Sequence, residues 1–284
     1  MWVLCYLRLL PVAVMRAWFV LTVVVNILIC SVNAYVIDLL RYAGVPRKWT
    51  QVLVGIDCRV FFALAVRLSP HIRIHVDESY QKWSDIPLGS AMVLNHTSFM
   101  DALLFVALSP WSYVVWCKTL MKASLRKIPI FGGVFDRVGH FPVYFNSSAD
   151  NDFSVDRDRQ AAVMARVKQH VDNAKPIALF PEGAVNVTPR QLKPFRHGSF
   201  KLMIDNKMPI YYMVVVGNAE TWPGSAPVGG FPADIFVEIH KYNVDYAKAD
   251  LDCASLAAAM QAEMQKVVGA LYAKMDAVGT KKSN

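Results

Sequence analysis

The segment Val93–Phe105, VLNHTSFMDALLF, places a group of polar residues between two apolar runs. Its histidine, His96, and its aspartate, Asp101, lie five positions apart. In a continuous helix, five residues at about 100° each would leave the two side chains roughly 140° apart. A contact between them therefore needs a turn, and Asp101 is placed to begin a helix over DALLFVAL. The segment predicts a short strand, a polar turn and a helix.

Strand-like and helix-like stretches alternate along the chain around this segment. Apolar or alternating runs predict strands at 72–76, 91–95, 113–117, the end of 128–145, 176–180, 208–218 and 233–242. Helices are predicted from Asp101, at 157–174 and at 255–278, while Gly132 and Gly133 predict a turn and 148–156 a polar loop. This order predicts an α/β domain with a mixed, largely parallel sheet flanked by helices.

Two of the most polar loops, NHTSFMD (95–101) and PEGAVN (181–186), directly follow predicted buried strands. Ligand sites in open α/β sheets lie beyond the carboxyl ends of the strands. We therefore expect the two loops to face each other across one crevice.

The first 70 residues predict membrane-associated helices, and residues 71–284 form the predicted α/β domain. Residues 17–37 run for 21 positions without a charge, which is the length that a helix needs to cross a bilayer core. Residues 52–68 are apolar but charged in places, and predict an amphipathic helix lying in the membrane interface or on the protein. The alternative is a cleaved signal peptide ending near 32–34, which the apolar segment before Arg16 disfavours.

Composition also favours membrane association. Hydrophobic residues make up 55% of the chain and charged residues 18%, with a mean hydropathy of +0.30. The net charge of +8 suits anionic lipid surfaces or phosphorylated ligands, and no run of Lys and Arg interleaved with aromatic residues points to nucleic acid. The five cysteines are scattered without CxxC or Cys/His spacing, so we expect reduced thiols and no metal site.

A histidine held by a carboxylate can act as a general base, because the carboxylate fixes the imidazole tautomer and stabilises the imidazolium. His96 would then deprotonate a hydroxyl group of the substrate itself. Ser98 is an unconvincing nucleophile because it lies only two residues from His96 and the chain has no G-x-S-x-G elbow. Taken alone, His96 and Asp101 also fit structural roles, as a satisfied histidine at a strand end and a helix N-cap.

The wider pattern resembles a known family. NHTSFMD is similar to the N-H-x4-D signature of the glycerolipid acyltransferases, the 1-acylglycerol-3-phosphate acyltransferase family. LFPEG (179–183) and MPIYYMVV (208–215) resemble the family's F-P-E-G and V-P-I-x-P blocks, and two further segments, 117–133 and 192–203, also match. The order and spacing of these blocks hold from about residue 90 to 218.

The resemblance implies transfer of a fatty acyl group from acyl-CoA, or acyl carrier protein, to the sn-2 hydroxyl of 1-acylglycerol-3-phosphate, giving phosphatidic acid. It implies that His96 is the general base and Asp101 its partner, with no metal, acyl-enzyme or cofactor beyond the co-substrate acyl-CoA. Substrate binding is expected of residues in or beside the matching blocks, namely Asn95, Lys118, Arg137, Glu182, Gly183 and Arg196.

The partners implied are membrane lipid, a lysophospholipid acceptor and acyl-CoA, with no nucleic acid. We expect the protein at the endoplasmic reticulum with a cytosol-facing active site, with a bacterial inner membrane as the alternative.

Two positions depart from the family's pattern. The family's G-x-x-F-I-x-R block aligns best with 139–145, which puts Phe145 where a phosphate-binding arginine belongs, and a competing alignment with GGVFDR supplies Arg137 instead. The family's E-G-T-R reads EGAV here, with Ala184 and Val185. A lost charged hydrogen bond costs on the order of 1.5–3 kcal/mol. Another lysophospholipid or glycerol phosphate therefore stays open as the acceptor.

Two other classes of protein also stay open. A lipid-binding or scaffolding membrane protein with a vestigial catalytic loop would explain the altered arginine positions, although it would not need both His96 and Asp101. An esterase or lipase would need the serine elbow that the sequence lacks.

Overall fold

The computed structural model describes residues 1–146, 155–248 and 251–283. The predicted polar loop at 148–156 lies outside the described residues apart from its last two positions.

The described residues form a seven-stranded sheet with the order β1-β7-β6-β2-β5-β3-β4. The strands are β1 (Ile72–Asp77), β2 (Ala91–Leu94), β3 (Lys118–Lys122), β4 (Phe141–Val143), β5 (Ile177–Leu179), β6 (Ile210–Val216) and β7 (Ala233–Tyr242). All neighbouring pairs are parallel except β6 and β7. The sheet is therefore mixed and largely parallel, as the sequence predicts.

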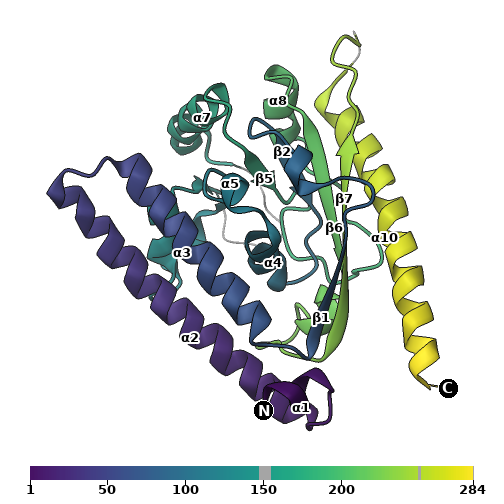
Figure 1. Ribbon diagram of the computed structural model, residues 1–284. Helices are drawn as coiled ribbons and strands as arrows, with labels where there is room; N and C mark the ends of the chain where they lie inside the picture. The colour runs from purple at the N-terminus through teal and green to yellow at the C-terminus, as the bar shows by residue number, and fades with distance from the viewer. Residues whose placement is uncertain (147–154, 249–250, 284) are drawn as a thin grey trace.

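Helices cover both faces of this sheet (Figure 1). The helices that follow β1 are α4 (Met100–Leu108), α5 (Trp111–Val114), α6 (Gly132–Val138), α7 (Arg157–Asp172), α8 (Gly198–Asp205), α9 (Asn218–Thr221) and α10 (Cys253–Ser283). Short 3-10 turns occur at η2 (Trp83–Asp85) and η3 (Ala123–Lys127). Every residue of β6 is buried, as expected of a central strand with both faces covered.

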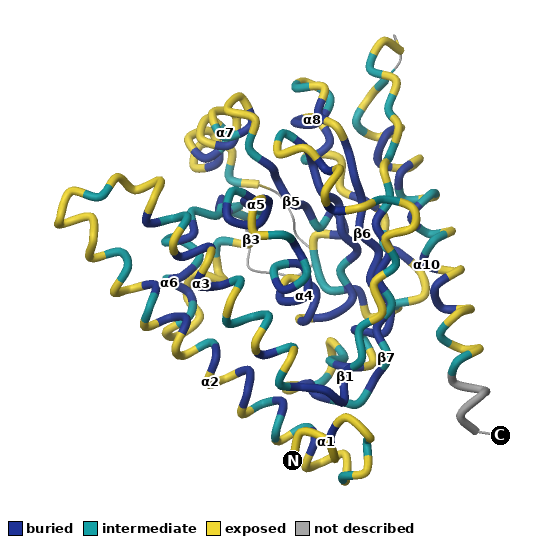
Figure 2. The backbone as a smooth tube through the Cα atoms, in the orientation of Figure 1, coloured by how far each residue is buried: buried dark blue, intermediate teal, exposed yellow. Residues whose placement is uncertain are grey.

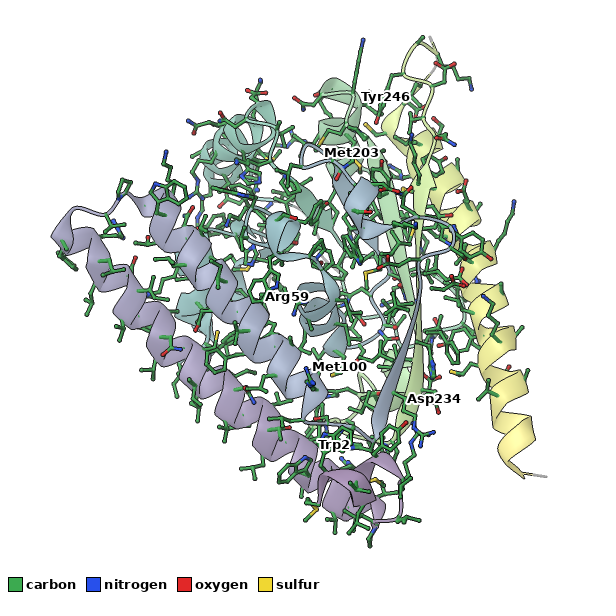
Figure 3. The ribbon with its side chains drawn as sticks, in the orientation of Figure 1. Trp2, Arg59, Met100, Met203, Asp234 and Tyr246 are labelled. Carbon is green, nitrogen blue, oxygen red and sulfur yellow. The ribbon has the colours of Figure 1, made fainter. Side chains whose placement is uncertain are left out.

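Side chains alternate between the two faces along each strand, and this alternation separates two hydrophobic cores. Tyr212 and Val214 of β6 pack in one core with α7, α8 and α10. Met213 and Val215 pack in the other core with α4 and the N-terminal helices. Figure 3 labels Met203 and Met100, which belong to the first and second core respectively.

The N-terminal region is a pair of long antiparallel helices (Figure 1). The short helix α1 (Trp2–Tyr6) precedes α2 (Val12–Leu39), which continues through η1 (Leu40–Ala43) and turns into α3 (Arg47–Arg67). Both α2 and α3 are long and apolar enough to cross a membrane. Figure 2 shows exposed residues along the outer side of α2. The exposed apolar residues of this helix include Leu21, Leu28 and Val32.

Two charged side chains of the helix pair, Asp57 and Arg59, make hydrogen bonds within the protein. Asp57 accepts a hydrogen bond of 2.8 Å from Asn33 across the α2–α3 interface, and Arg59 donates to the Ser109 carbonyl at 2.8 Å. Near the N-terminus, Arg8 forms an ion pair of 2.8 Å with Asp234 of β7 (Figure 3 labels Asp234). The helix pair is thus fastened to the α/β domain by Arg59 in the middle of α3 and by Arg8 just before α2.

Most predicted elements are confirmed, and two are corrected. The strand predicted at 113–117 is wrong, because Pro110 begins the short helix α5 and the strand β3 begins only at Lys118. Tyr113 packs against Trp83 and hydrogen-bonds Ser90, so tertiary contacts override the β propensity of this stretch. The turn predicted at Gly132 and Gly133 is instead the first turn of α6.

Candidate active site

The two polar loops that follow β2 and β5 lie together and are joined directly by hydrogen bonds. The backbone N–H of His96 donates to Oε1 of Glu182 at 2.7 Å. The backbone N–H of Asn186 donates to the His96 carbonyl at 2.7 Å. Because β2 and β5 are parallel neighbours, their carboxyl ends deliver both loops to the same edge of the sheet.

His96 and Asp101 form a hydrogen-bonded pair at this edge. Nδ1 of His96 lies 2.8 Å from Oδ2 of Asp101, and the backbone N–H groups of Thr97 and Ser98 donate to the same oxygen at 2.7 and 2.9 Å. The carboxylate thereby closes the turn between β2 and α4. This is the turn that the five-residue spacing requires.

The two members of the pair differ in exposure. The Asp101 side chain is 1% exposed, whereas the His96 side chain is 23% exposed. Since the ionised carboxylate only accepts, Nδ1 of His96 must carry the proton, which leaves Nε2 as an acceptor. No described residue bonds Nε2, so this nitrogen can take a proton from a substrate. The ring of Phe180 lies 4.8 Å from the imidazole, centroid to centroid.

Asn218 is part of this site, although no motif in the sequence predicted it. Its Nδ2 donates to Oδ1 of Asp101, and its Oδ1 accepts from the Thr97 hydroxyl at 3.2 Å. Asn218 lies two positions beyond the end of β6, which pairs in parallel with β2. A polar residue just beyond the carboxyl end of the neighbouring strand is the signal that could have found it.

Glu182 holds the two loops together. Besides His96, it accepts from Asn186 Nδ2 at 2.8 Å and from the Lys193 N–H at 3.0 Å, and it is 2% exposed. Burial raises the pKa of Glu182, and the hydrogen bonds from these donors oppose that rise. Both carboxylate oxygens accept hydrogen bonds within the protein, so Glu182 braces the two loops, and its contact with substrate stays a prediction.

Gly183 and Arg196 lie against each other next to Glu182. Gly183 has a φ of +73°, which favours glycine, and a Cβ at this position would collide with the Arg196 guanidinium group. The backbone N–H of Arg196 donates to the Pro181 carbonyl at 2.9 Å. The structure therefore places the positive charge of Arg196 next to the loop that bonds His96, and partial burial lowers the pKa of this guanidinium.

Asn95 has a structural position at the end of β2. Its side-chain amide donates to the Val215 carbonyl and accepts from the Val215 N–H, both at 2.8 Å. Asn95 is 1% exposed, so it extends the β2–β6 pairing by one residue and fixes the start of the His96 loop.

Comparison with known proteins agrees with this geometry. Residues 71–216 match the model of the protein family described as Acyltransferase. The chain belongs to the acyltransferase family. The matched region runs from just before β1 to the end of β6, so it contains His96, Asp101 and Glu182.

Curated relatives are similar over part of their length. The chain is 27% identical over 170 residues to the chloroplastic 1-acyl-sn-glycerol-3-phosphate acyltransferase BAT2 of Brassica napus, covering 60% of this chain and 44% of that one. It is 23% identical over 160 residues to the 1-acyl-sn-glycerol-3-phosphate acyltransferase of Helicobacter pylori, covering 55% and 60%. The chain thus spans less than two thirds of these relatives.

A solved structure shares the fold. The crystal structure of the 1-acyl-sn-glycerophosphate (LPA) acyltransferase PlsC from Thermotoga maritima superimposes with a TM-score of 0.57 at 17% identity. The match covers 90% of this chain and 98% of that one. The α/β arrangement and the N-terminal helices therefore belong to a shared architecture.

The structure does not bring Lys118 to the His96 loop. Lys118 pairs in register with Ile177, so it lies level with the start of β5, whereas the His96 contacts lie beyond the end of that strand. Its ammonium group is buried and donates to the Val138 carbonyl at 2.5 Å. Burial lowers the pKa of Lys118 to about 8. Its side chain is enclosed by the protein and does not reach the edge where a substrate would enter.

Arg137 is likewise engaged away from the His96 loop. Its guanidinium lies 3.6 Å from the centre of the Tyr35 ring, 3.7 Å from Asp38 and 2.9 Å from the Gly133 carbonyl. These contacts fasten α6 to α2. The competing alignment that made Arg137 the phosphate ligand therefore gains no support from its position. Among the described residues, no group of three His, Cys, Asp or Glu side chains is arranged to hold a metal.

Proposed function

We propose that this protein is a membrane-bound O-acyltransferase that moves a fatty acyl group from acyl-CoA to the sn-2 hydroxyl of 1-acylglycerol-3-phosphate, giving phosphatidic acid. The observation that carries the proposal is the His96–Asp101 pair, with Nδ1 held by a buried carboxylate and Nε2 left as an acceptor. The names of the curated relatives support the choice of acceptor.

The reaction follows from the orientation of the imidazole. Nε2 of His96 removes the proton from the substrate hydroxyl as its oxygen attacks the thioester carbonyl carbon. The resulting imidazolium is stabilised by Asp101. When the tetrahedral intermediate collapses, the carbon–sulfur bond breaks and the thiolate of CoA takes the proton from His96. The products are the new ester and free CoA thiol, and the enzyme returns to its starting state.

Arg196 is the guanidinium that we propose for the acceptor phosphate. It lies on Gly183, and Glu182 next to it bonds the backbone of His96, so a phosphate on Arg196 would sit close to the general base. Arginine binds phosphate through paired N–H donors. Because Ala184 and Val185 replace the family's threonine and arginine, a lysophospholipid with a different head group is the second candidate acceptor.

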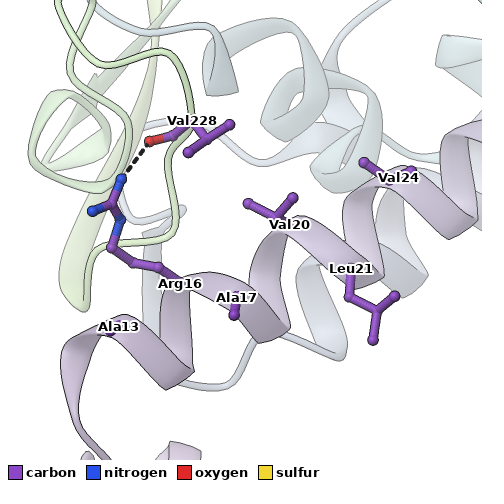
Figure 4. Close-up of a pocket in the computed structure, with 7 residues that line it drawn as sticks. All are labelled: Ala13, Arg16, Ala17, Val20, Leu21, Val24 and Val228. Atoms are coloured by element: carbon purple, nitrogen blue, oxygen red, sulfur yellow. Dashed lines mark hydrogen bonds between the residues drawn. The ribbon is translucent and has the colours of Figure 1, made fainter.

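We propose that α2 and α3 hold the active site at the surface of a membrane. An open apolar groove of about 580 Å³ runs along α2 and is lined by Ala13, Arg16, Ala17, Val20, Leu21, Val24 and Val228 (Figure 4). Arg16 is its only charged lining residue among those described and donates to the Val228 carbonyl at 3.0 Å. Such a surface suits lipid chains more than water. The cytosolic face of the endoplasmic reticulum fits a soluble acyl-CoA donor, and a bacterial inner membrane is the alternative.

The test uses the purified protein in detergent with a labelled acyl-CoA and a panel of lysophospholipids and glycerol phosphate. We expect a product that contains both the acyl group and lysophosphatidate, at a higher rate than with other acceptors. Free fatty acid without any acylated acceptor would indicate an esterase. Lipid binding without any turnover would indicate a scaffolding protein.

A further inference from the structure

The carboxylate of Asp101 has two oxygens, and only one is held by its own loop. Oδ2 accepts from the His96 ring and from the N–H groups of Thr97 and Ser98. Oδ1 points away from that loop and accepts from Nδ2 of Asn218, which lies 117 positions later in the chain. Both Asp101 and Asn218 are buried, with 1% and 0% exposure.

The orientation of the Asn218 amide is fixed by its partners. An ionised carboxylate can only accept, so the amide nitrogen has to face Asp101. The amide oxygen then faces Thr97, whose hydroxyl donates to it at 3.2 Å. The opposite orientation would set the amide oxygen against a carboxylate oxygen. The position is fixed as well, because the N–H of Trp222 donates to the Asn218 carbonyl at 2.9 Å.

The backbone just before Asn218 has a conformation that favours glycine. Gly217 has a φ of +92°, and a Cβ there would collide with the carbonyl oxygen of Asp234 on the neighbouring strand. After α9 the chain returns to the same loop, where the Trp222 carbonyl accepts from the Ser98 hydroxyl at 2.8 Å. The segment 217–222 therefore holds the catalytic loop at Thr97, Ser98 and Asp101.

We propose that Asn218 is a positioning residue for the acyl-transfer reaction, which acts through Asp101 to hold the His96 imidazole in its reactive orientation. The inference rests on the proposed function, since it assumes that His96 is the general base. Without the amide, Oδ1 is a buried acceptor with no donor, and the carboxylate can rotate away from Nδ1 of His96. Asn218 lies behind Asp101, so its loss lowers kcat and leaves KM for both substrates nearly unchanged.

A double-mutant cycle separates this role from a general packing role. Acyl transfer is measured for the wild type, Asn218→Ala, Asp101→Ala and the double variant, with labelled acyl-CoA and lysophosphatidate. We expect Asn218→Ala to lower kcat by about tenfold to hundredfold in the wild-type background. In the Asp101→Ala background we expect the same substitution to change the residual kcat by less than about twofold, because the group it acts through is gone.

Two further variants control for effects of folding defects on kcat. Thr97→Val keeps the side-chain volume but removes the bond that orients the Asn218 amide, and we expect a smaller loss of kcat that also disappears with Asp101→Ala. Asn206→Ala removes an amide that donates to the Leu202 carbonyl at the end of α8, and should leave kcat unchanged. Thermal unfolding of each variant reports whether the fold is retained.

The outcomes distinguish the two claims. Equal losses in the wild-type and Asp101→Ala backgrounds, or an unchanged kcat in Asn218→Ala, would overturn the positioning role. A wild-type protein that transfers no acyl group to any acceptor, or a His96→Ala variant with full kcat, would overturn the proposed function instead.

Discussion

The backbone N–H of His96 donates to the side chain of Glu182 at 2.7 Å, which ties the His96 loop to a carboxylate 86 positions away. Glu182 in turn accepts from Asn186 and Lys193. One buried carboxylate therefore fixes the backbone of both loops at the edge of the sheet. The Glu182 contact sets where His96 lies, and the Asp101 contact sets how its ring is turned.

Replacing Glu182 with glutamine should weaken the hydrogen bonding that holds the two loops together. One side-chain oxygen remains to accept from His96, but the new NH2 group faces the donors Asn186 Nδ2 and the Lys193 N–H. Buried donors without acceptors cost about 1–3 kcal/mol each. We expect a lower midpoint of denaturant unfolding and a lower kcat for Glu182→Gln. Unchanged stability together with a raised KM would show that Glu182 binds substrate instead.

Gly183→Ala should lower activity by at least about tenfold, because the new methyl group forces the Arg196 guanidinium aside. Left-handed backbone adds roughly 1–2 kcal/mol of strain for any L-residue. Gly44→Ala is the matched control, since Gly44 has a φ of +85° but open space around its Cβ position. Steady-state kinetics of the two variants separates the clash from the strain. Equal activities of Gly183→Ala and Gly44→Ala would show that the displacement of Arg196 does not affect acyl transfer.

Arg196→Ala should raise KM for a phosphate-bearing acceptor by about tenfold and change KM for acyl-CoA little, if Arg196 binds the acceptor phosphate. The control is Arg190→Ala, because the Arg190 guanidinium is paired with Asp276 at 2.8 Å on the surface and should not affect KM. KM for lysophosphatidate is compared with that for an acceptor of different head group. An equal rise for both acceptors would assign Arg196 to loop structure.

The lowered pKa of Lys118 predicts that the stability of the fold depends on pH. Its pKa is about 8 in the folded protein against 10.5 for the unperturbed group, so between these values the unfolded chain binds the extra proton. The free energy of unfolding should therefore rise with pH from about 8 to about 10.5, by about 3 kcal/mol in total. Lys118→Met should abolish this rise and leave KM for both substrates unchanged. The measurement is the denaturant midpoint of both proteins across this pH range. If the difference in denaturant midpoint between the wild type and Lys118→Met does not change with pH, the lowered pKa of Lys118 is refuted.

The His96–Asp101 turn was predictable because its signal is local. Polar residues at the carboxyl end of an apolar strand, followed by an aspartate at the start of a helix, leave few arrangements other than the one observed. The order of strands and helices along the chain likewise predicted the mixed sheet. These features depend on residues within about ten positions of one another.

The rest of the site depends on pairings that are distant in sequence. Asn218 reaches Asp101 only because β6 lies next to β2, and the strand order was not part of the sequence-based prediction. Lys118 was placed in the site because segment 117–133 resembles a family block, and the burial of its side chain against the Val138 carbonyl is a tertiary contact that the block does not reveal. Arg137 was a choice between two alignments, and its packing on Tyr35 is a tertiary contact that spacing does not reveal.

The substitution His96→Asn tests most directly whether Nε2 of His96 is the base. The asparagine amide can still donate to Asp101 from nearly the position of Nδ1, so the turn is retained while Nε2 is lost. With labelled acyl-CoA and lysophosphatidate, and with thermal unfolding showing an intact fold, we predict that kcat falls by at least about a thousandfold. A folded His96→Asn protein that retains kcat within about tenfold of the wild type would contradict the account.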